Sequence, residues 1–173
     1  MNLKKLLIPL LIIMVLLVGC SWGKGAASTT RELLMEPRVS DDVLITTAKR
    51  VFIAVMEAED KALSTPGNSE TKKNILFSAL GRVAAQPLIK AYEEAWAAQQ
   101  LGITLTVKKI SRAKVVEKTT TQGVVVFQVD GTVNDESGSQ PVSDYYSITL
   151  EKHGDKWLLA NMEIVRSNSI LPS

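Results

Sequence analysis

The pattern of hydrophobic and polar residues changes twice along the chain. Residues 6–18 are an almost unbroken apolar run, and residues 40–101 repeat apolar positions every three or four residues. From residue 103 onward apolar and polar residues alternate. A period near 3.6 predicts helices that bury one face, and a period of two predicts strands. The chain is therefore expected to have an apolar leading segment, then helices, then a sheet.

The helical part divides into three segments separated by turn residues. The expected helices span about residues 40–63, 69–83 and 87–101. Ser40 and Ser69 supply the hydroxyl groups expected to cap the first two helices. Pro87 suits the first turn of the third helix, and Gly102 is expected to stop it.

Four strands are expected after the helices. They lie at about residues 103–117, 123–133, 146–150 and 158–164, with a turn-rich segment over residues 134–140. The first strand mixes apolar and basic residues from position 107 onward, so it is either long and bent or split by a bulge. Helices followed by antiparallel strands predict an α+β domain in which the N-terminal helices pack on a curved antiparallel sheet of about four strands.

The leading segment has the features of an export signal. Lys4 and Lys5 precede the apolar run of residues 6–18, a charge and length typical of a secretory signal. The residues that close it read Leu17-Val18-Gly19-Cys20, which resembles the lipobox of bacterial lipoproteins. The resemblance implies cleavage before Cys20, a diacylglyceryl group on its sulfur, and attachment to membrane lipid on the extracytoplasmic side. The alternative is an uncleaved anchor helix, since residues 6–23 carry no charge.

These features divide the chain into four parts. Residues 1–19 are expected to be the signal peptide, residues 20–39 a tether, residues 40–167 the α+β domain and residues 168–173 a C-terminal tail. The chain has 173 residues and one cysteine, so no intramolecular disulfide can form.

The last expected hairpin carries a second resemblance. It reads Gly154-Asp155-Lys156-Trp157-Leu158-Leu159-Ala160-Asn161, and it resembles the closing hairpin of the NTF2-like (SnoaL or ketosteroid-isomerase-like) superfamily. The resemblance implies a conical cavity between sheet and helices, used for catalysis or ligand binding or filled by packing. The side chains expected to line or fill it are Phe52, Trp96, Phe127, Tyr146 and Trp157.

No set of residues predicts a catalytic centre. Asp144 and Tyr146 are the nearest to an acid and phenol pair, but a strand would place Tyr145 and Tyr146 on opposite faces. His153, the only histidine, lies in a turn where a solvated side chain is expected. The acidic residues of the helices are expected on solvated faces; they are Glu57, Glu59, Asp60, Glu93 and Glu94. No metal-ligand cluster or phosphate-binding loop occurs, so no cofactor is expected.

The charge balance limits the partners. The chain has 20 basic and 18 acidic residues, and removal of Lys4 and Lys5 leaves 18 of each. Nucleic-acid binding is therefore not expected, because it needs an excess of basic residues to contact the phosphates. The one basic concentration is Lys108, Lys109, Arg112, Lys114 and Lys118; it either faces anionic lipid or a wall polymer, or protects an exposed strand edge. We expect a non-enzymatic envelope module that binds a partner protein or a second copy through its sheet face. The alternative is a small-molecule carrier or an isomerase- or hydrolase-type enzyme that uses the cavity.

Overall fold

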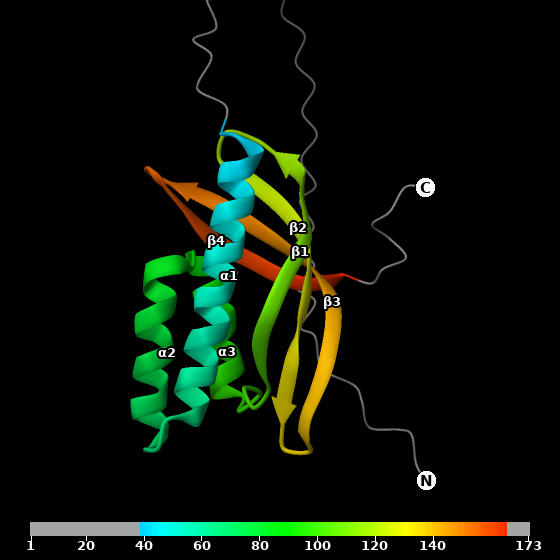
Figure 1. The fold of residues 1–173 in the computed structure, drawn as a ribbon. Helices are drawn as coiled ribbons and strands as arrows, with labels where there is room; N and C mark the ends of the chain where they lie inside the picture. Colours follow the sequence, from blue (N-terminus) through cyan, green and yellow to red (C-terminus); the bar gives the residue numbers. More distant parts are fainter. Residues whose placement is uncertain (1–38, 166–173) are drawn as a thin grey trace, which may run out of the picture. The chain divides into compact units, whose positions relative to one another are not determined.

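The computed structural model describes residues 39–165, which fold as three helices followed by four strands (Figure 1). The elements are α1 (Asp41–Ser64), α2 (Ser69–Val83), α3 (Gln86–Ala97), β1 (Thr104–Lys118), β2 (Gln122–Asp135), β3 (Gly138–His153) and β4 (Lys156–Val165). The strands form one antiparallel sheet in the order β1-β2-β3-β4. The α+β architecture expected from the sequence is confirmed.

The predicted export signal, Cys20 and the predicted C-terminal tail lie outside the described residues. Among residues 39–165 no helix is both long and apolar enough to cross a membrane.

The helices begin at side-chain caps, one of which differs from the prediction. Ser40 caps α1 as expected, since its hydroxyl oxygen accepts a hydrogen bond from the Val43 amide at 3.3 Å. The prediction that Ser69 caps α2 is wrong. Asn68 is the cap, and its side-chain oxygen accepts from the Thr71 amide at 2.9 Å. Both residue types suit an N-cap, but it is Asn68 that has the extended backbone, with φ −77° and ψ 168°.

Helix α3 ends earlier than the glycine signal predicted. Its last residue is Ala97, and Gln99 then adopts a left-handed backbone with φ 54°. Because Gln99 provides the conformation that reverses the chain, Gly102 is not the stop.

The turn between β2 and β3 is shorter than the predicted segment of residues 134–140. The two strands pair up to Asp135 and Gly138, which leaves only two residues in the turn. The Asp135 carboxylate accepts hydrogen bonds from the Ser137 amide at 2.8 Å and the Ser137 hydroxyl at 2.5 Å. These bonds lower the pKa of Asp135. Gly138 takes a positive φ of 125°, which favours glycine. These turn contacts allow β2 and β3 to continue pairing into the polar residues that were predicted to form a longer turn.

Strand β1 is one strand of 15 residues with three register shifts, so it combines the length of the first predicted alternative with the bulges of the second. Its register against β2 shifts between Val107 and Lys109, between Ser111 and Lys114, and between Val115 and Glu117.

The core lies between the helices and one face of the sheet. Figure 1 shows all three helices on the same side. Phe52 of α1 and Phe127 of β2 are both fully buried there. The α2–α3 connection reaches the outer edge of β4, where the Ala85 amide donates to the Leu159 carbonyl at 2.8 Å. The packing of the helices on the sheet and the pairing of the strands therefore determine which side chains contact one another in the core.

Candidate functional site

An aromatic cluster lies where α1 crosses the sheet. The Phe52 ring is 5.3 Å from the Phe127 ring and 5.0 Å from the Tyr146 ring, measured between centroids. Phe52 and Phe127 are completely buried, whereas Tyr146 is half-buried. Three of the five residues predicted to line or fill a cavity are therefore brought together, and their rings occupy the space between helix and sheet.

The two tryptophans of the predicted set lie apart from this cluster. The Trp96 ring of α3 contacts the Phe77 ring of α2, with centroids 6.4 Å apart. Trp157 is buried in the core from β4, with 8% of its surface exposed.

Glu59 lies next to the aromatic cluster, and the prediction that it is solvated is wrong. The Tyr92 hydroxyl of α3 donates a hydrogen bond to a Glu59 carboxylate oxygen. Burial raises the pKa of Glu59 to about 7, although the Tyr92 hydrogen bond opposes the rise. Burial and the neighbouring Glu59 together hold the pKa of Tyr92 well above its usual value. The helical spacing contained this signal, because Glu59 follows buried Phe52 by seven residues and buried Val55 by four.

Tyr146 faces the same interior region from β3. Burial, together with the charges of Asp144 and Glu59, raises its pKa to about 12. Tyr146 therefore stays protonated at neutral pH and can donate a hydrogen bond. Tyr145 points to the opposite face, where Arg112 donates to its hydroxyl at 2.9 Å. The expected separation of the two tyrosines is confirmed.

The interior polar groups thus come from three elements. Glu59 on α1, Tyr92 on α3 and Tyr146 on β3 supply one carboxyl and two phenol groups beside an apolar ring. A carboxyl that titrates near neutral pH can take up or release a proton.

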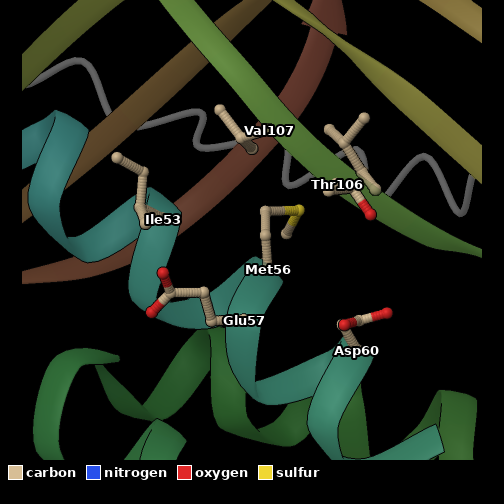
Figure 2. Close-up of a pocket in the computed structure, with 7 residues that line it drawn as sticks. Ile53, Met56, Glu57, Asp60, Thr106 and Val107 are labelled. Carbon is tan, nitrogen blue, oxygen red and sulfur yellow. The ribbon is translucent and has the colours of Figure 1, made fainter. Parts of the chain in front are cut away.

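A hollow lies between α1 and β1 (Figure 2). It has a volume of about 130 Å³ and is lined by Ile53, Met56, Glu57, Asp60, Leu105, Thr106 and Val107. Glu57 and Asp60 are exposed, as predicted, and lie on either side of Met56 on α1. The hollow is large enough for about one side chain or a few water molecules.

The remaining candidate groups are solvated. Glu93 and Glu94 are exposed, with Glu94 4.0 Å from Lys90. His153 is exposed in the β3–β4 turn, where its Nε2 lies 3.5 Å from a Glu151 oxygen. Within residues 39–165 no three His, Cys, Asp or Glu side chains are grouped so as to hold a metal ion.

The sheet face turned away from the helices is largely polar. Gln128 donates to the Ser143 hydroxyl at 2.7 Å, and Ser143 donates to the Asp130 carboxylate at 2.6 Å. With the Arg112–Tyr145 bond these contacts cross three adjacent strands. The face therefore offers hydrogen-bonding and charged groups in its central part.

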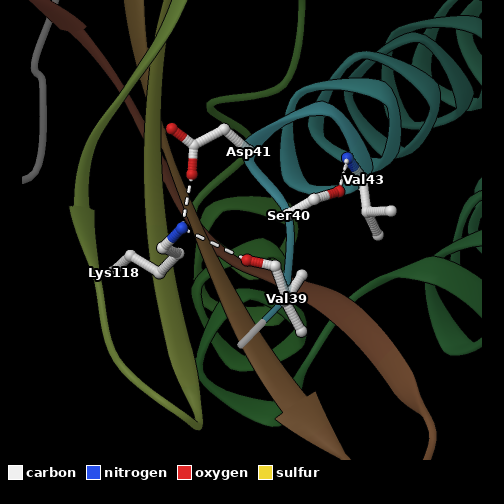
Figure 3. A network of polar contacts seen from close by, with 5 residues as sticks. All are labelled: Val39, Ser40, Asp41, Val43 and Lys118. Atoms are coloured by element: carbon white, nitrogen blue, oxygen red, sulfur yellow. Dashed lines mark hydrogen bonds and ion pairs between the residues drawn. The ribbon is translucent and has the colours of Figure 1, made fainter. Parts of the chain in front are cut away.

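The point where the chain enters the domain is fixed to the end of β1 (Figure 3). The Lys118 ammonium group donates to the Asp41 carboxylate at 2.5 Å and to the Val39 carbonyl at 3.2 Å. Because Val39 precedes α1, the segment leading to Cys20 joins the domain beside the last residue of β1.

Comparison with known proteins shows similarity of fold alone. No protein-family model matches the chain, and no curated protein matches it by sequence. The intermembrane space region of the chloroplast protein ARC6 is similar in structure, with a TM-score of 0.52 and 14% identity over 76% of this chain and 100% of that one. An NTF2-like protein of unknown function in nutrient uptake from Rhodospirillum rubrum has a TM-score of 0.46 and 14% identity, over 70% of this chain and 98% of that one.

Proposed function

We propose that this protein is a membrane-anchored extracytoplasmic lipoprotein whose domain is a non-enzymatic binding module of the cell envelope. The main structural support for the proposal is the filled interior of the domain. The Phe52 and Phe127 rings occupy the space between helix and sheet, so a partner would bind at the surface. We further propose that the domain is NTF2-like, on the order of its elements and the closing hairpin.

The anchor is supported by the residues around Cys20. Two lysines, thirteen apolar residues and then Gly19-Cys20 match an export signal that ends in a lipobox-like sequence. Two acyl chains hold a protein at a membrane durably, because each buried methylene contributes about 0.8 kcal/mol. The fold is compatible with such a setting, since a similar domain is described as part of a chloroplast intermembrane space.

Cys20→Ser tests the anchor in cells that express the full chain. We expect the variant to lose incorporation of labelled palmitate and to accumulate at the larger, unprocessed size. Ser21→Ala is the matched control, because it alters the neighbouring residue and keeps the sulfur; it should be labelled and processed normally. Unchanged labelling of Cys20→Ser would reject the lipoprotein assignment.

The binding role is supported by the polar outer face of the sheet. Its hydrogen bonds arrange charged and polar groups from β1, β2 and β3 on one surface, which suits recognition of a polar partner more than burial of an apolar one. Charge reversal at Asp130 should weaken crosslinking of the full-length protein to its envelope partner, whereas Asp155→Lys, in the β3–β4 turn, should leave it unchanged. Equal crosslinking of both variants would reject this face as the binding surface.

A specific observation favours a second function, that of a small-molecule carrier or an enzyme. Glu59 is desolvated beside Tyr92, and Tyr146 faces the same region, which is an arrangement that could hold a polar group of a ligand in an apolar setting.

Fluorescence of 1-anilinonaphthalene-8-sulfonate separates the two functions. A carrier or enzyme should bind the dye saturably, and Tyr146→Phe or Glu59→Gln should change the affinity. A domain that binds only through its surface should show no saturable signal, with or without these substitutions.

A further inference from the structure

The edge strand β1 carries a concentration of cations. Lys108, Lys109, Arg112 and Lys114, which we call the basic strip, are all exposed. The acidic groups close to them in the sheet are Glu117 on β1 and Asp130 on β2, the latter opposite Lys109. The Arg112 guanidinium donates a hydrogen bond to the Tyr145 hydroxyl at 2.9 Å and forms no ion pair within 4.0 Å among the described residues. Counted over these sheet residues alone, four basic and two acidic side chains give a formal charge of +2.

The bulges of β1 determine that these cations face away from the core. Val107 pairs with Gly131 and Ile110 pairs with Val129, so both apolar side chains pack toward the helices. Strict alternation from Val107 would turn Lys109 toward the helices as well. The register shift after Val107 instead places Lys109 opposite Asp130, on the outer face.

The second register shift acts in the same way. It leaves Ser111 opposite Gln128 and Lys114 opposite Val126, both on the outer face, although the two residues are three positions apart. The irregular strand thus collects basic side chains on one exposed surface.

The strip lies on the strand that also receives the chain from Cys20. Lys118 binds the Val39 carbonyl, so the domain is entered at the end of β1 (Figure 3). Residues 21–38 separate Cys20 from Val39, and a coil of that length spans about 23 Å on average. Strand β1, with 15 residues, is about 50 Å long at about 3.3 Å per residue. A lipid on Cys20 would therefore hold this strand within reach of the headgroups.

We propose that the basic strip is a second membrane contact, at which the tethered domain lies against the phosphate groups of anionic lipids. The proposal rests on the lipid anchor proposed above. Each Lys or Arg near such a surface raises the equilibrium constant for contact by about fivefold. A net charge of +2 would therefore bind a domain without an anchor only weakly. The anchor makes it effective, because it holds the domain at a high local concentration beside the lipid.

The test uses the full-length lipidated protein in vesicles of phosphatidylcholine, with or without about 30% phosphatidylglycerol. Lipidation consumes the only native thiol, so a fluorophore can be attached at Val116→Cys, an exposed position of β1, or at Ser78→Cys on α2 as the control site. A headgroup-attached quencher reports closeness to the membrane. We expect the Val116 probe to be quenched only in the anionic vesicles, with reversal by about 0.5 M NaCl, and the Ser78 probe to be unaffected.

Charge reversal identifies the residues responsible. The double variant Lys109→Glu, Lys114→Glu should lower the equilibrium constant for contact between β1 and the membrane by at least about tenfold. Quenching of the Val116 probe measures this constant. The matched control reverses two lysines on the helices, Lys73→Glu with Lys90→Glu, and should retain the quenching.

The outcomes separate this proposal from the anchor on which it rests. Loss of the protein from vesicles in salt means that the anchor is absent. Vesicle retention with equal quenching in both lipid mixtures overturns the membrane contact and leaves the strip as protection of an exposed strand edge.

Discussion

Replacement of Glu59 by Gln should remove a large pH dependence of stability. Burial raises the pKa of Glu59 from 4.5 to about 7, so the folded protein binds a proton more tightly than the unfolded chain does. The free energy of unfolding should therefore be highest below about pH 4.5 and fall as the pH rises to about 7, then stay level. A difference of about 2.5 pKa units corresponds to about 3 kcal/mol.

Urea unfolding between about pH 4.5 and 8.5 measures this loss. Glu59→Gln keeps an oxygen that can accept from Tyr92 but cannot ionise, so it should lack this part of the pH dependence. The variant should be at least as stable as the wild type above pH 7. Glu57→Gln is the control, because it removes the same charge from an exposed position on the same helix.

A second variant checks the role of the hydrogen bond. Tyr92→Phe removes a group that lowers the pKa of Glu59, so the stability loss should move to higher pH. The reasoning would be refuted if Glu59→Gln had the same pH slope as the wild type, or if Glu57→Gln removed the slope.

Three further predictions concern local structure, each checked by urea unfolding at one pH. Gly81→Ala should stabilise the protein by about 0.5–1 kcal/mol, because a Cβ there meets no atom within 4 Å; destabilisation would show that α2 needs the glycine. Gly131→Ala should destabilise by about 1–3 kcal/mol, since its Cβ would lie 2.6 Å from the Thr106 carbonyl oxygen, and a neutral result would contradict that close approach. Asn68→Ala should cost about 1 kcal/mol and Ser69→Ala less than about 0.5 kcal/mol, whereas the reverse order would restore Ser69 as the cap.

Local patterns were sufficient for the order of elements. The spacing of buried Leu44, Ala48, Val51, Phe52 and Val55 follows one face of a helix, as the sequence predicted. Alternation of Val125, Phe127 and Val129 likewise marks one face of β2. Such periods depend only on residues close together in the sequence, so they can be recognised without the structure.

Details at the ends of elements were predicted less well, because two neighbouring residues can supply the same chemistry. Asn68 and Ser69 are both good caps, and the backbone conformation that packing selects decides between them. Gln99 ends the helical run where Gly102 was expected, since a left-handed residue need not be glycine.

The sequence by itself determined the α+β order and the buried stripe of α1. Only the tertiary structure decided that Glu59 is half-buried and desolvated against Tyr92, and that Lys109 is exposed. Glu59 is desolvated because Tyr92, 33 residues away, lies against it from another helix. Lys109 avoids the core because pairing with β2 introduces a bulge. A local period shows which side of a helix a residue lies on, but how far its side chain is desolvated depends on which distant segments pack against it.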